Sequence, residues 1–510
     1  MTHTDRPLLI SSGLRASAAR TPDKTALICE ERSLTYRELA SRSARVAGAA
    51  IRAGLRKGDR VALVAPNCLE YPELMCGLTD AGLIVATLSP RLTEREIREA
   101  CEDCGARWII AHPAAAPVVP KSAAACERVL WLGEEYEGWI ASADPVGPVA
   151  ELTERDPFTL VYSSGTTGKP KGIVISHRSR TLTFHAMAME YGCYGPDDLQ
   201  LGIAPMSHGA GFAFIMASLF FGGAVEVLPR FEAETVLSRL AATPFTGVFM
   251  VPAHFHAIFA LEPAVLARYQ GRFPFLRTIM SNASALPQAT KARIVDYWGE
   301  GLLHETYGST EAGIVTNLRP VDQLRRLQSV GLPFALNEVR LLDEEGHEVG
   351  PGEVGELYSR SPYLFEGYFG KPEETAAALR EGWVTAGDLA RRDEDGYLYI
   401  VDRKKDMVVT GGFNVYPREI EEQLVMHPTV AEAAVVGVPD AHWGEALVAF
   451  IVPRPGCSLD DSALETFCRE RLAGYKVPKR FLSINELPRN AGGKVLKNEL
   501  RAGFKQAAPV

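Results

Sequence analysis

The sequence predicts an α/β protein with a large, multi-layer amino-terminal domain and a small α+β domain at the carboxyl end. Between residues 35 and 135, helical stretches alternate with short apolar runs such as residues 60–66 and 107–112. This alternation is typical of doubly wound, largely parallel sheets covered by helices. The same rhythm returns further along the chain, in residues 159–165, 224–230, 245–259 and 276–287.

From about residue 325 the pattern changes to short strand-like pieces separated by Gly, Pro and charged turns. Such pieces, at 337–343, 352–362 and 397–404, predict a β-rich subdomain within the large domain. Helical patterns at 417–427 and 462–474 alternate with strand-like runs near the end of the chain. We therefore predict two domains, residues 1–402 and residues 403–510.

Composition and charge exclude several classes of protein. The chain has 510 residues, of which 46% are hydrophobic and 23% are charged, so it can bury large cores. Its 54 Lys and Arg against 63 Asp and Glu give a net charge of −9 at pH 7. Neither nucleic acid nor an anionic membrane would be held by such a global field. The first residues lack a basic start followed by an apolar run, so we predict no secretory signal and a cytoplasmic location.

Two local features have structural explanations. Residues 201–225 carry no charged side chain but contain Pro205 and several glycines, so we predict a loop and a buried helix at about 212–221, not a membrane span. Nine scattered cysteines do not form a disulfide pattern. Cys101 and Cys104 have no second pair at zinc-finger spacing, so we expect both to be core residues.

The most informative segment is YSSGTTGKPKG, residues 162–172, which follows a strand-like run. Its glycines and small hydroxyl residues let backbone amides approach an anion, and Lys169 and Lys171 add positive charge. The segment is not a Walker A loop, because Ser163 and Pro170 stand where that motif needs Gly and Ser or Thr. The residues themselves predict a polyphosphate-binding loop.

This segment resembles the signature of the adenylate-forming superfamily, which comprises acyl-CoA synthetases, adenylation domains of peptide synthetases, and luciferases. Four further blocks that resemble family motifs follow in the expected order: APMSHGAG at 204–211, ETYGSTE at 305–311, TAGDL through PREIE at 385–421, and PRNAGGKVLK at 488–497.

The resemblance implies two half-reactions and the cofactors ATP, Mg²⁺ and coenzyme A. A carboxylate attacks the α-phosphorus of ATP to give acyl-AMP and pyrophosphate, and a thiol then displaces AMP. We expect a ligase that joins a monocarboxylic acid, aromatic or medium-chain, to CoA. The alternative is a free-standing adenylating enzyme that loads an acyl carrier protein in trans. Oxidative light emission and a non-catalytic nucleotide-binding regulator are less well supported. Homodimers occur in such families, so a homodimer is also open.

The resemblance also assigns residues to ATP. Tyr307 would face adenine, Thr310 would contact the α-phosphate, and Glu311 would bind Mg²⁺. Lys494 would bridge the carboxylate and the α-phosphate in the transition state. The remaining nucleotide-binding residues would be Ser163, Ser164, Gly165, Thr166, Thr167, Gly168 and Lys171 in the loop, and Asp388 and Arg403 at the ribose.

For the second half-reaction, the family pattern implies that the small domain rotates about a hinge at Lys405. Gly411 and Gly412 would leave a passage for the pantetheine arm, and Tyr475 and Lys479 would contact the CoA nucleotide. The acyl pocket would be lined by Phe184, His208, Gly209, Ala283, Gly308, Gly313 and Ile314. None of these blocks offers an evident Arg for a second carboxylate on the substrate. The loop SNASALP departs from the glycine-alanine-proline wording that is usual in the family.

Overall fold

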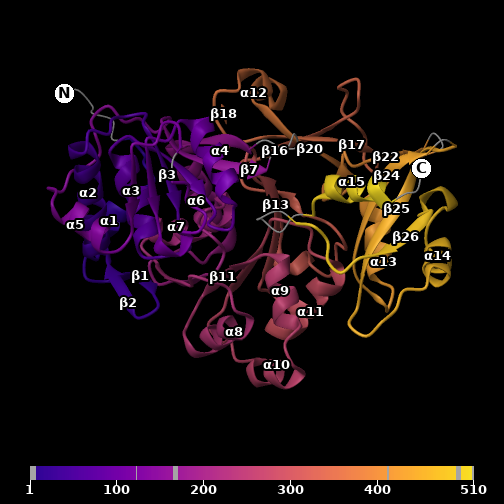
Figure 1. The fold of residues 1–510 in the computed structure, drawn as a ribbon. Helices are drawn as coiled ribbons and strands as arrows, with labels where there is room; N and C mark the ends of the chain where they lie inside the picture. Colours follow the sequence, from indigo (N-terminus) through magenta and orange to yellow (C-terminus); the bar gives the residue numbers. More distant parts are fainter. Residues whose placement is uncertain are drawn as a thin grey trace. The chain divides into compact units, whose positions relative to one another are not determined.

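The structure, a computed structural model, describes residues 7–121, 123–164, 170–410, 413–440, 442–489 and 495–507 (Figure 1). Contacts divide the chain into two compact units. The first unit comprises Met1–Val339 with Ser359–Val384, and the second comprises Arg340–Tyr358 with Thr385–Val510. The predicted α/β class is confirmed, whereas the division after residue 402 stays a prediction about a mobile domain.

A seven-stranded sheet in the first unit has the order β18-β8-β7-β4-β3-β5-β6. Its central strands are parallel, and β7 and β8 form an antiparallel hairpin. Helices between the strands complete the predicted doubly wound pattern. The elements are β3 (Arg60–Val64), α3 (Glu70–Asp80), β4 (Ile84–Leu88), α4 (Glu94–Cys104), β5 (Trp108–Ala111), η1 (Pro113–Ala115), β6 (Arg128–Trp131), α5 (Glu134–Ala141), β7 (Pro157–Ser164), β8 (Pro170–Ser176) and β18 (Gly367–Tyr368).

A nine-stranded sheet, also in the first unit, has the order β15-β14-β13-β12-β11-β9-β10-β1-β2. Its strands are β1 (Thr25–Cys29), β2 (Arg32–Thr35), β9 (Leu199–Gly202), β10 (Ala224–Val227), β11 (Gly247–Met250), β12 (Thr278–Ser281), β13 (Leu303–Ser309), β14 (Gly313–Leu318) and β15 (Leu332–Pro333). The helices of this part are α1 (Ser12–Arg20), α2 (Tyr36–Arg52), α6 (His177–Tyr191), α7 (Gly209–Phe221), α8 (Ala233–Ala242), α9 (Pro252–Phe259), α10 (Pro263–Tyr269), α11 (Gln288–Trp298) and η2 (Pro320–Asp322).

A five-stranded sheet, in which β20 is antiparallel to β19 and β21, accounts for the predicted β-rich part. Its order is β16-β17-β20-β19, with β21 paired to β20. The sheet contains β16 (Glu338–Leu342), β17 (Val354–Arg360), β19 (Leu379–Arg380), β20 (Trp383–Arg392) and β21 (Leu398–Arg403), and α12 (Pro372–Ala378) precedes β19 in the chain. Strand β20 carries the TAGDL block, which periodicity alone did not identify as a strand.

The carboxy-terminal part of the second unit is α+β, as predicted. Its sheet has the order β23-β22-β25-β24, with β26 parallel to β25. Apolar residues on β24 and β25 contribute to separate core clusters. The elements are β22 (Val408–Thr410), β23 (Phe413–Val415), α13 (Pro417–Val425), β24 (Val430–Asp440), β25 (Gly444–Pro453), α14 (Asp461–Arg469), η3 (Gly474–Lys476), β26 (Arg480–Ser483) and α15 (Lys497–Ala507).

The uncharged stretch 201–225 forms a strand, a loop and the buried helix α7, which begins three residues before the predicted start. No helix in the described ranges has the length and apolar character needed to cross a bilayer. Cys101 and Cys104 are both buried on α4, within a cluster of apolar side chains, as expected.

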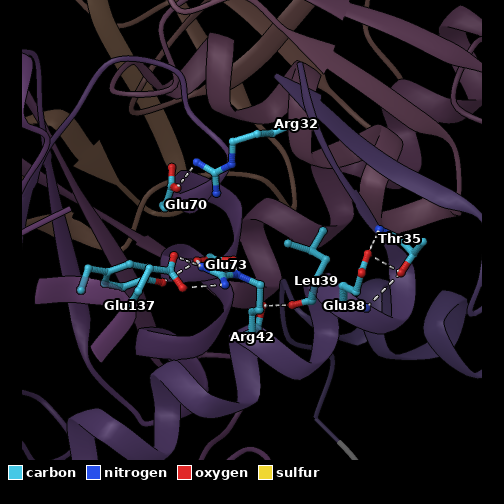
Figure 2. Close-up of polar contacts among 10 residues, drawn as sticks. Arg32, Thr35, Glu38, Leu39, Arg42, Glu70, Glu73 and Glu137 are labelled. Carbon is cyan, nitrogen blue, oxygen red and sulfur yellow. Dashed lines mark hydrogen bonds and ion pairs between the residues drawn. The ribbon is translucent and has the colours of Figure 1, made fainter. Parts of the chain in front are cut away.

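Polar side chains fix the amino-terminal helices to one another (Figure 2). Thr35 caps α2, because its hydroxyl accepts the backbone N–H of Glu38 at 3.2 Å while Glu38 Oε2 accepts the Thr35 N–H at 2.8 Å. Arg42 on α2 binds Glu73 on α3 through two hydrogen bonds of 2.6 and 2.9 Å, and it also pairs with Glu137 at 2.7 Å. The Glu73 side chain is fully buried and also accepts the hydroxyl of Tyr136 at 2.6 Å. Burial raises the pKa of Glu73, and Arg42 and Tyr136 oppose that shift.

We expect Glu73→Gln to destabilise the first unit by about 3 kcal/mol, because the amide leaves the buried side of the Arg42 guanidinium without a carboxylate. The matched control is Glu137→Gln, since the Glu137 side chain is 45% exposed and should contribute less than about 1 kcal/mol. Thermal denaturation at pH 7 compares the two variants. Equal shifts in the melting temperature would contradict this account of the cluster.

Candidate functional site

The hairpin of β7 and β8 places the predicted phosphate loop at its tip. Tyr162 pairs with Gly172 and Ser163 with Lys171, so the two strands converge on residues 165–169. Those five residues lie outside the described ranges, and with them the predicted ligands Gly165, Thr166, Thr167 and Gly168. Ser163 and Ser164 end strand β7, which fixes their backbone at the start of the loop.

Lys171 and Glu311 lie close together although they come from separate motif blocks. The ammonium group of Lys171 lies 5.3 Å from the centre of the Tyr368 ring and forms an ion pair with Glu374 on α12. The hydroxyl of Tyr368 donates a hydrogen bond of 2.9 Å to Glu311 Oε1. Tyr368 is in position because β18 pairs with β8 next to Lys171. Sequence reasoning missed Tyr368 and Glu374, since neither belongs to a recognised block.

The charges of this group affect one another. The hydrogen bond from Lys171 lowers the pKa of the Glu374 carboxyl group. Burial raises the pKa of Tyr368, and the neighbouring Glu311 carboxylate raises it further. The Tyr368 hydroxyl therefore stays protonated at neutral pH and remains a hydrogen-bond donor to Glu311.

Glu311 offers oxygen ligands of the kind that Mg²⁺ prefers. In the part of the chain that the structure describes, no group of three or more His, Cys, Asp or Glu side chains is placed to hold a metal ion. A cation at Glu311 would therefore complete its coordination with water and with phosphate oxygens of a bound nucleotide, which is the usual arrangement for Mg²⁺. The residues fit that role.

The ETYGSTE block forms strand β13 and the turn into β14. Gly308 faces Ile314, and Ser309 faces Gly313, in an antiparallel pair. Thr310 and Glu311 lie in the turn, which is held by a hydrogen bond of 2.8 Å from the Phe365 N–H to the Glu311 carbonyl oxygen. Half-buried Tyr307 lies on the strand just before Gly308.

A buried ion pair supports β13 at its other end. Lys291 on α11 is 1% exposed, pairs with Glu305, and donates a hydrogen bond of 3.3 Å to the carbonyl oxygen of Ser329. Such a pair fixes the position of the strand because neither charge can lose its partner without a large penalty.

The predicted acyl-pocket residues do not share one environment. Phe184 is fully buried, and its ring packs against Phe220 at 5.5 Å between centroids. Ala283 is exposed and has φ of +81°, a left-handed conformation that is strained for any residue with a Cβ. Ala283 lies in the SNASALP loop, whose sequence differs from the usual family wording, and it adopts a conformation that suits glycine. Ile314 is buried on β14, beside Gly313.

His208 and Gly209 mark the start of helix α7. Burial lowers the pKa of His208, and the positive charge of Arg91 lowers it further, so the imidazole is neutral at pH 7. A methyl group placed on the α-carbon of Gly209 would lie 3.6 Å from Arg180 Nη2 and 3.9 Å from Thr310 Cγ2. The Arg180 guanidinium and the turn of the ETYGSTE block therefore both lie close to the α-carbon of Gly209.

In the second unit, Asp388 on β20 and Arg403 on β21 are paired across the hairpin. Arg403 Nε lies 3.3 Å from Asp388 Oδ1, and Asp388 is buried. The resemblance predicted that Asp388 and Arg403 both contact the ribose of ATP. Their ion pair is consistent with two neighbouring residues at one site, and the contact with ribose stays a prediction. Lys405 follows in the next turn, where burial lowers the pKa of its ammonium group.

The remaining predicted residues lie at the carboxyl end. Tyr475 is exposed and stacks on Phe413, with ring centroids 4.5 Å apart, and the Lys479 ammonium lies 5.0 Å from the centre of the Trp443 ring. Gly411 and Gly412, between β22 and β23, lie outside the described residues.

Lys494 also lies outside the described residues, but both flanks of its segment are fixed. Arg489 and Val495 form an antiparallel bridge around residues 490–494. Lys497, at the start of α15, pairs with the carboxylate of Glu421 at 2.7 Å.

Comparisons with known proteins give matches along nearly the whole chain. A family model described as "AMP-binding enzyme" matches residues 14–369, and one described as "AMP-binding enzyme C-terminal domain" matches residues 419–494. A feruloyl-CoA synthase from an Amycolatopsis species is 37% identical over 492 residues, which cover 96% of this chain and 97% of that protein. The fatty acid–[acyl-carrier-protein] ligase ScoC from Streptomyces coeruleorubidus is 35% identical over 496 residues, covering 96% and 95%. The crystal structure of ATP-bound MatB from Rhodopseudomonas palustris superimposes with a TM-score of 0.87 at 29% identity, covering 96% and 99%.

An added methyl group should lower the melting temperature at one glycine of the site and leave it unchanged at another. A Cβ at Gly308 would lie 2.0 Å from the backbone oxygen of Gly313, whereas a Cβ at Gly209 would make only ordinary contacts. We expect Gly308→Ala to lower the melting temperature by several degrees, since strained core positions typically cost about 1 to 3 kcal/mol. Gly209→Ala should leave it unchanged. Differential scanning fluorimetry of both variants checks this, and an undiminished melting temperature for Gly308→Ala would contradict the close approach of β13 and β14.

Proposed function

Because the chain belongs to the family of AMP-binding enzymes, as its motif blocks predicted, we propose that it is an ATP-dependent acid–thiol ligase. It activates a monocarboxylic acid as acyl-AMP and transfers the acyl group to coenzyme A. The observation that carries this proposal is the contact chain from Lys171 through Tyr368 to Glu311, which joins a cation beside the loop to a carboxylate beside Thr310. Relatives that are named as CoA synthases support the reaction class.

In the first half-reaction, the loop at 163–168 and Lys171 hold the β- and γ-phosphates of ATP. Lys171 must exchange its partner Glu374 for a phosphate oxygen when ATP binds. Glu311 would hold Mg²⁺, which neutralises phosphate charge when it is bound. Tyr307 faces adenine, Thr310 contacts the α-phosphate, and the ribose lies on Asp388 and Arg403. These groups act by position and charge, as expected for phosphoryl chemistry.

Lys494 completes the first half-reaction. Its ammonium group stabilises the negative charge that develops as the carboxylate attacks the α-phosphorus. The described residues on either side of Lys494 are held by the Arg489–Val495 bridge and by the Lys497–Glu421 ion pair.

In the second half-reaction, the domain that follows Lys405 turns about this residue and presents the segment with Gly411 and Gly412 to the acyl-AMP. The stacked rings of Tyr475 and Phe413 offer an aromatic surface for the adenine of CoA, and Lys479 supplies a nearby positive charge. The thiol then attacks the acyl carbon and AMP leaves.

The acid is aromatic or medium-chain, because the predicted pocket residues Gly209, Gly308 and Gly313 are small and Ile314 is apolar. Feruloyl-CoA synthase, a relative, has an aromatic acid in its name. The similarity to ScoC, which is named as a ligase of an acyl carrier protein, keeps a carrier-protein acceptor as the second candidate. A cytoplasmic location and a homodimer stay predictions from the sequence.

The direct test is pyrophosphate release with a panel of acids, namely benzoate, cinnamates, short and medium fatty acids and amino acids. We expect release with aromatic or medium-chain monocarboxylic acids, and a stable acyl-CoA when CoA is added. Activity confined to amino acids would overturn the proposed substrate class. Thioester formation only on a carrier protein, with CoA inert, would select the second candidate.

Lys494→Ala should separate the two half-reactions. We expect acyl-AMP formation to fall by at least 100-fold, since a preorganised charge in the transition state typically contributes about 10²- to 10³-fold. Thioester formation from supplied acyl-AMP, which needs no attack on ATP, should stay within about threefold of the wild type. This second assay serves as the control for folding, and an equal loss in both assays would remove Lys494 from the first step.

A further inference from the structure

Arg180 is a largely buried cation whose charge has no carboxylate partner. It lies in the first turn of α6, and no carboxylate in the described part of the chain approaches its guanidinium within the 4.0 Å of an ion pair. Its Nη1 donates one long hydrogen bond, 3.4 Å, to the carbonyl oxygen of Gly209. Its Nε is enclosed and has no hydrogen-bond partner among the described residues.

This state is unfavourable for three reasons. A buried charge loses hydration, and here no opposite charge compensates for the loss. An unsatisfied buried N–H loses a hydrogen bond that it makes in water. The positive end of the α6 dipole also repels a cation in its first turn. Burial lowers the pKa of Arg180 to about 10, so the guanidinium still carries its charge at pH 7.

The surroundings of Arg180 suit an organic anion. A cavity of about 10 Å³, the room of about one water molecule, adjoins the guanidinium. It marks a gap in the packing and is lined by Met75, Val161, Met206 and Phe212 together with Thr87 and Thr159. A polyphosphate carries several charges and is best held by several cations, and Arg180 is the one cation among the residues that line this cavity. A single carboxylate needs only one guanidinium, which it can engage through two parallel hydrogen bonds.

The position of Arg180 relates it to the reacting end of the acid. Arg180 Nη2 and Thr310 Cγ2 both lie within 4 Å of the point where a Cβ on Gly209 would be, at 3.6 and 3.9 Å. In the proposed function Thr310 contacts the α-phosphate, so a carboxylate bound by Arg180 at Gly209 would be next to the phosphorus that it attacks. The first N–H groups of α7 add a partial positive charge at the same place.

We propose that Arg180 binds the reacting carboxylate of the acid substrate and orients it toward the α-phosphate of ATP. This inference rests on the proposed function. One carboxylate oxygen forms the new bond to the α-phosphorus, the bond from that phosphorus to the bridging oxygen breaks, and the electron pair leaves with pyrophosphate. Neutral His208 supplies no charge for this task. Arg180 would hold the carboxylate in the ground state, and Lys494 would act on the charge that develops in the transition state.

The proposal predicts a particular kinetic pattern. Arg180 attracts the carboxylate most strongly before the reaction, because the acyl group of acyl-AMP no longer carries that charge. Its loss should therefore raise KM for the acid more than it lowers kcat. A charge-assisted hydrogen bond corresponds to roughly a 10- to 100-fold effect.

The test compares Arg180→Met with Arg178→Met, the same change in the same turn of α6. Arg178 pairs with Glu154 at 3.0 Å and its side chain is 36% exposed, so it is a surface control. Pyrophosphate release is measured with ferulate and with decanoate, varying the acid and ATP in turn. For Arg180→Met we expect KM for the acid to rise at least 10-fold, KM for ATP to change less than twofold, and the melting temperature to stay equal or rise. Arg178→Met should match the wild type in both KM values.

Several outcomes would overturn the proposal. A rise in KM for ATP alone would assign Arg180 to a phosphate, and a loss confined to dicarboxylic acids would assign it to a second carboxylate of the substrate. Unchanged KM values with a lower melting temperature would leave a structural role only. If Arg180→Met does not fold, Arg180→Lys decides, because a single ammonium should still raise KM for the acid severalfold, and an unchanged KM counts against the proposal.

Failure of the proposed function itself would look different. Wild-type protein would then release no pyrophosphate with any acid. Calorimetric titration of ferulate into wild type and Arg180→Met then tests the carboxylate site without catalysis. Weaker binding by Arg180→Met supports the site, and equal or absent binding overturns it.

Discussion

The pairing of β18 with β8 is the constraint on which the candidate site depends. Two residues of β18, far along the chain, align with Ile173 and Val174, and flanking hydrogen bonds of 2.8 and 2.9 Å extend the contact through Phe369 and Glu366. This short strand brings Tyr368 between Lys171 and Glu311. The cation beside the phosphate loop and the carboxylate of the ETYGSTE turn belong to separate sheets, and Tyr368 on β18 contacts both. The arrangement of Lys171, Tyr368 and Glu311 in the candidate site thus depends on a contact between two strands that are distant in the sequence.

Electrostatics reinforce that arrangement. The protein as a whole is acidic, yet its proposed substrates are anions, so their binding depends on local cations. Two of those cations are already neutralised, Lys171 by Glu374 and Arg403 by Asp388. An incoming ligand therefore exchanges one ion pair for another, which limits the cost of leaving a charge unpaired in the empty protein. Arg180 differs, because no described carboxylate neutralises its charge. This difference is the reason why we propose that it binds an anionic substrate.

Ion pairs also hold two elements that lie outside the proposed reacting groups. Lys291 and Glu305 hold β13 from within the core, and Lys497 and Glu421 hold the helix that follows Lys494. The Lys291–Glu305 pair is fully enclosed, and the Lys497–Glu421 side chains are 15% and 19% exposed, so in both pairs loss of one partner leaves a poorly solvated charge.

The sequence by itself determined the class of fold, the order of the motif blocks and the family, because these depend on periodicity and on residue types at fixed local spacing. It also indicated that α7 is a buried helix and that Cys101 and Cys104 are core residues. It did not show Tyr368, Glu374 or Arg180, since each acquires its role from residues distant in the chain. Nor did it show that Phe184 is enclosed in the core or that Ala283 adopts a left-handed conformation. Only the tertiary structure decided these points, because burial and charge pairing arise when distant segments pack together.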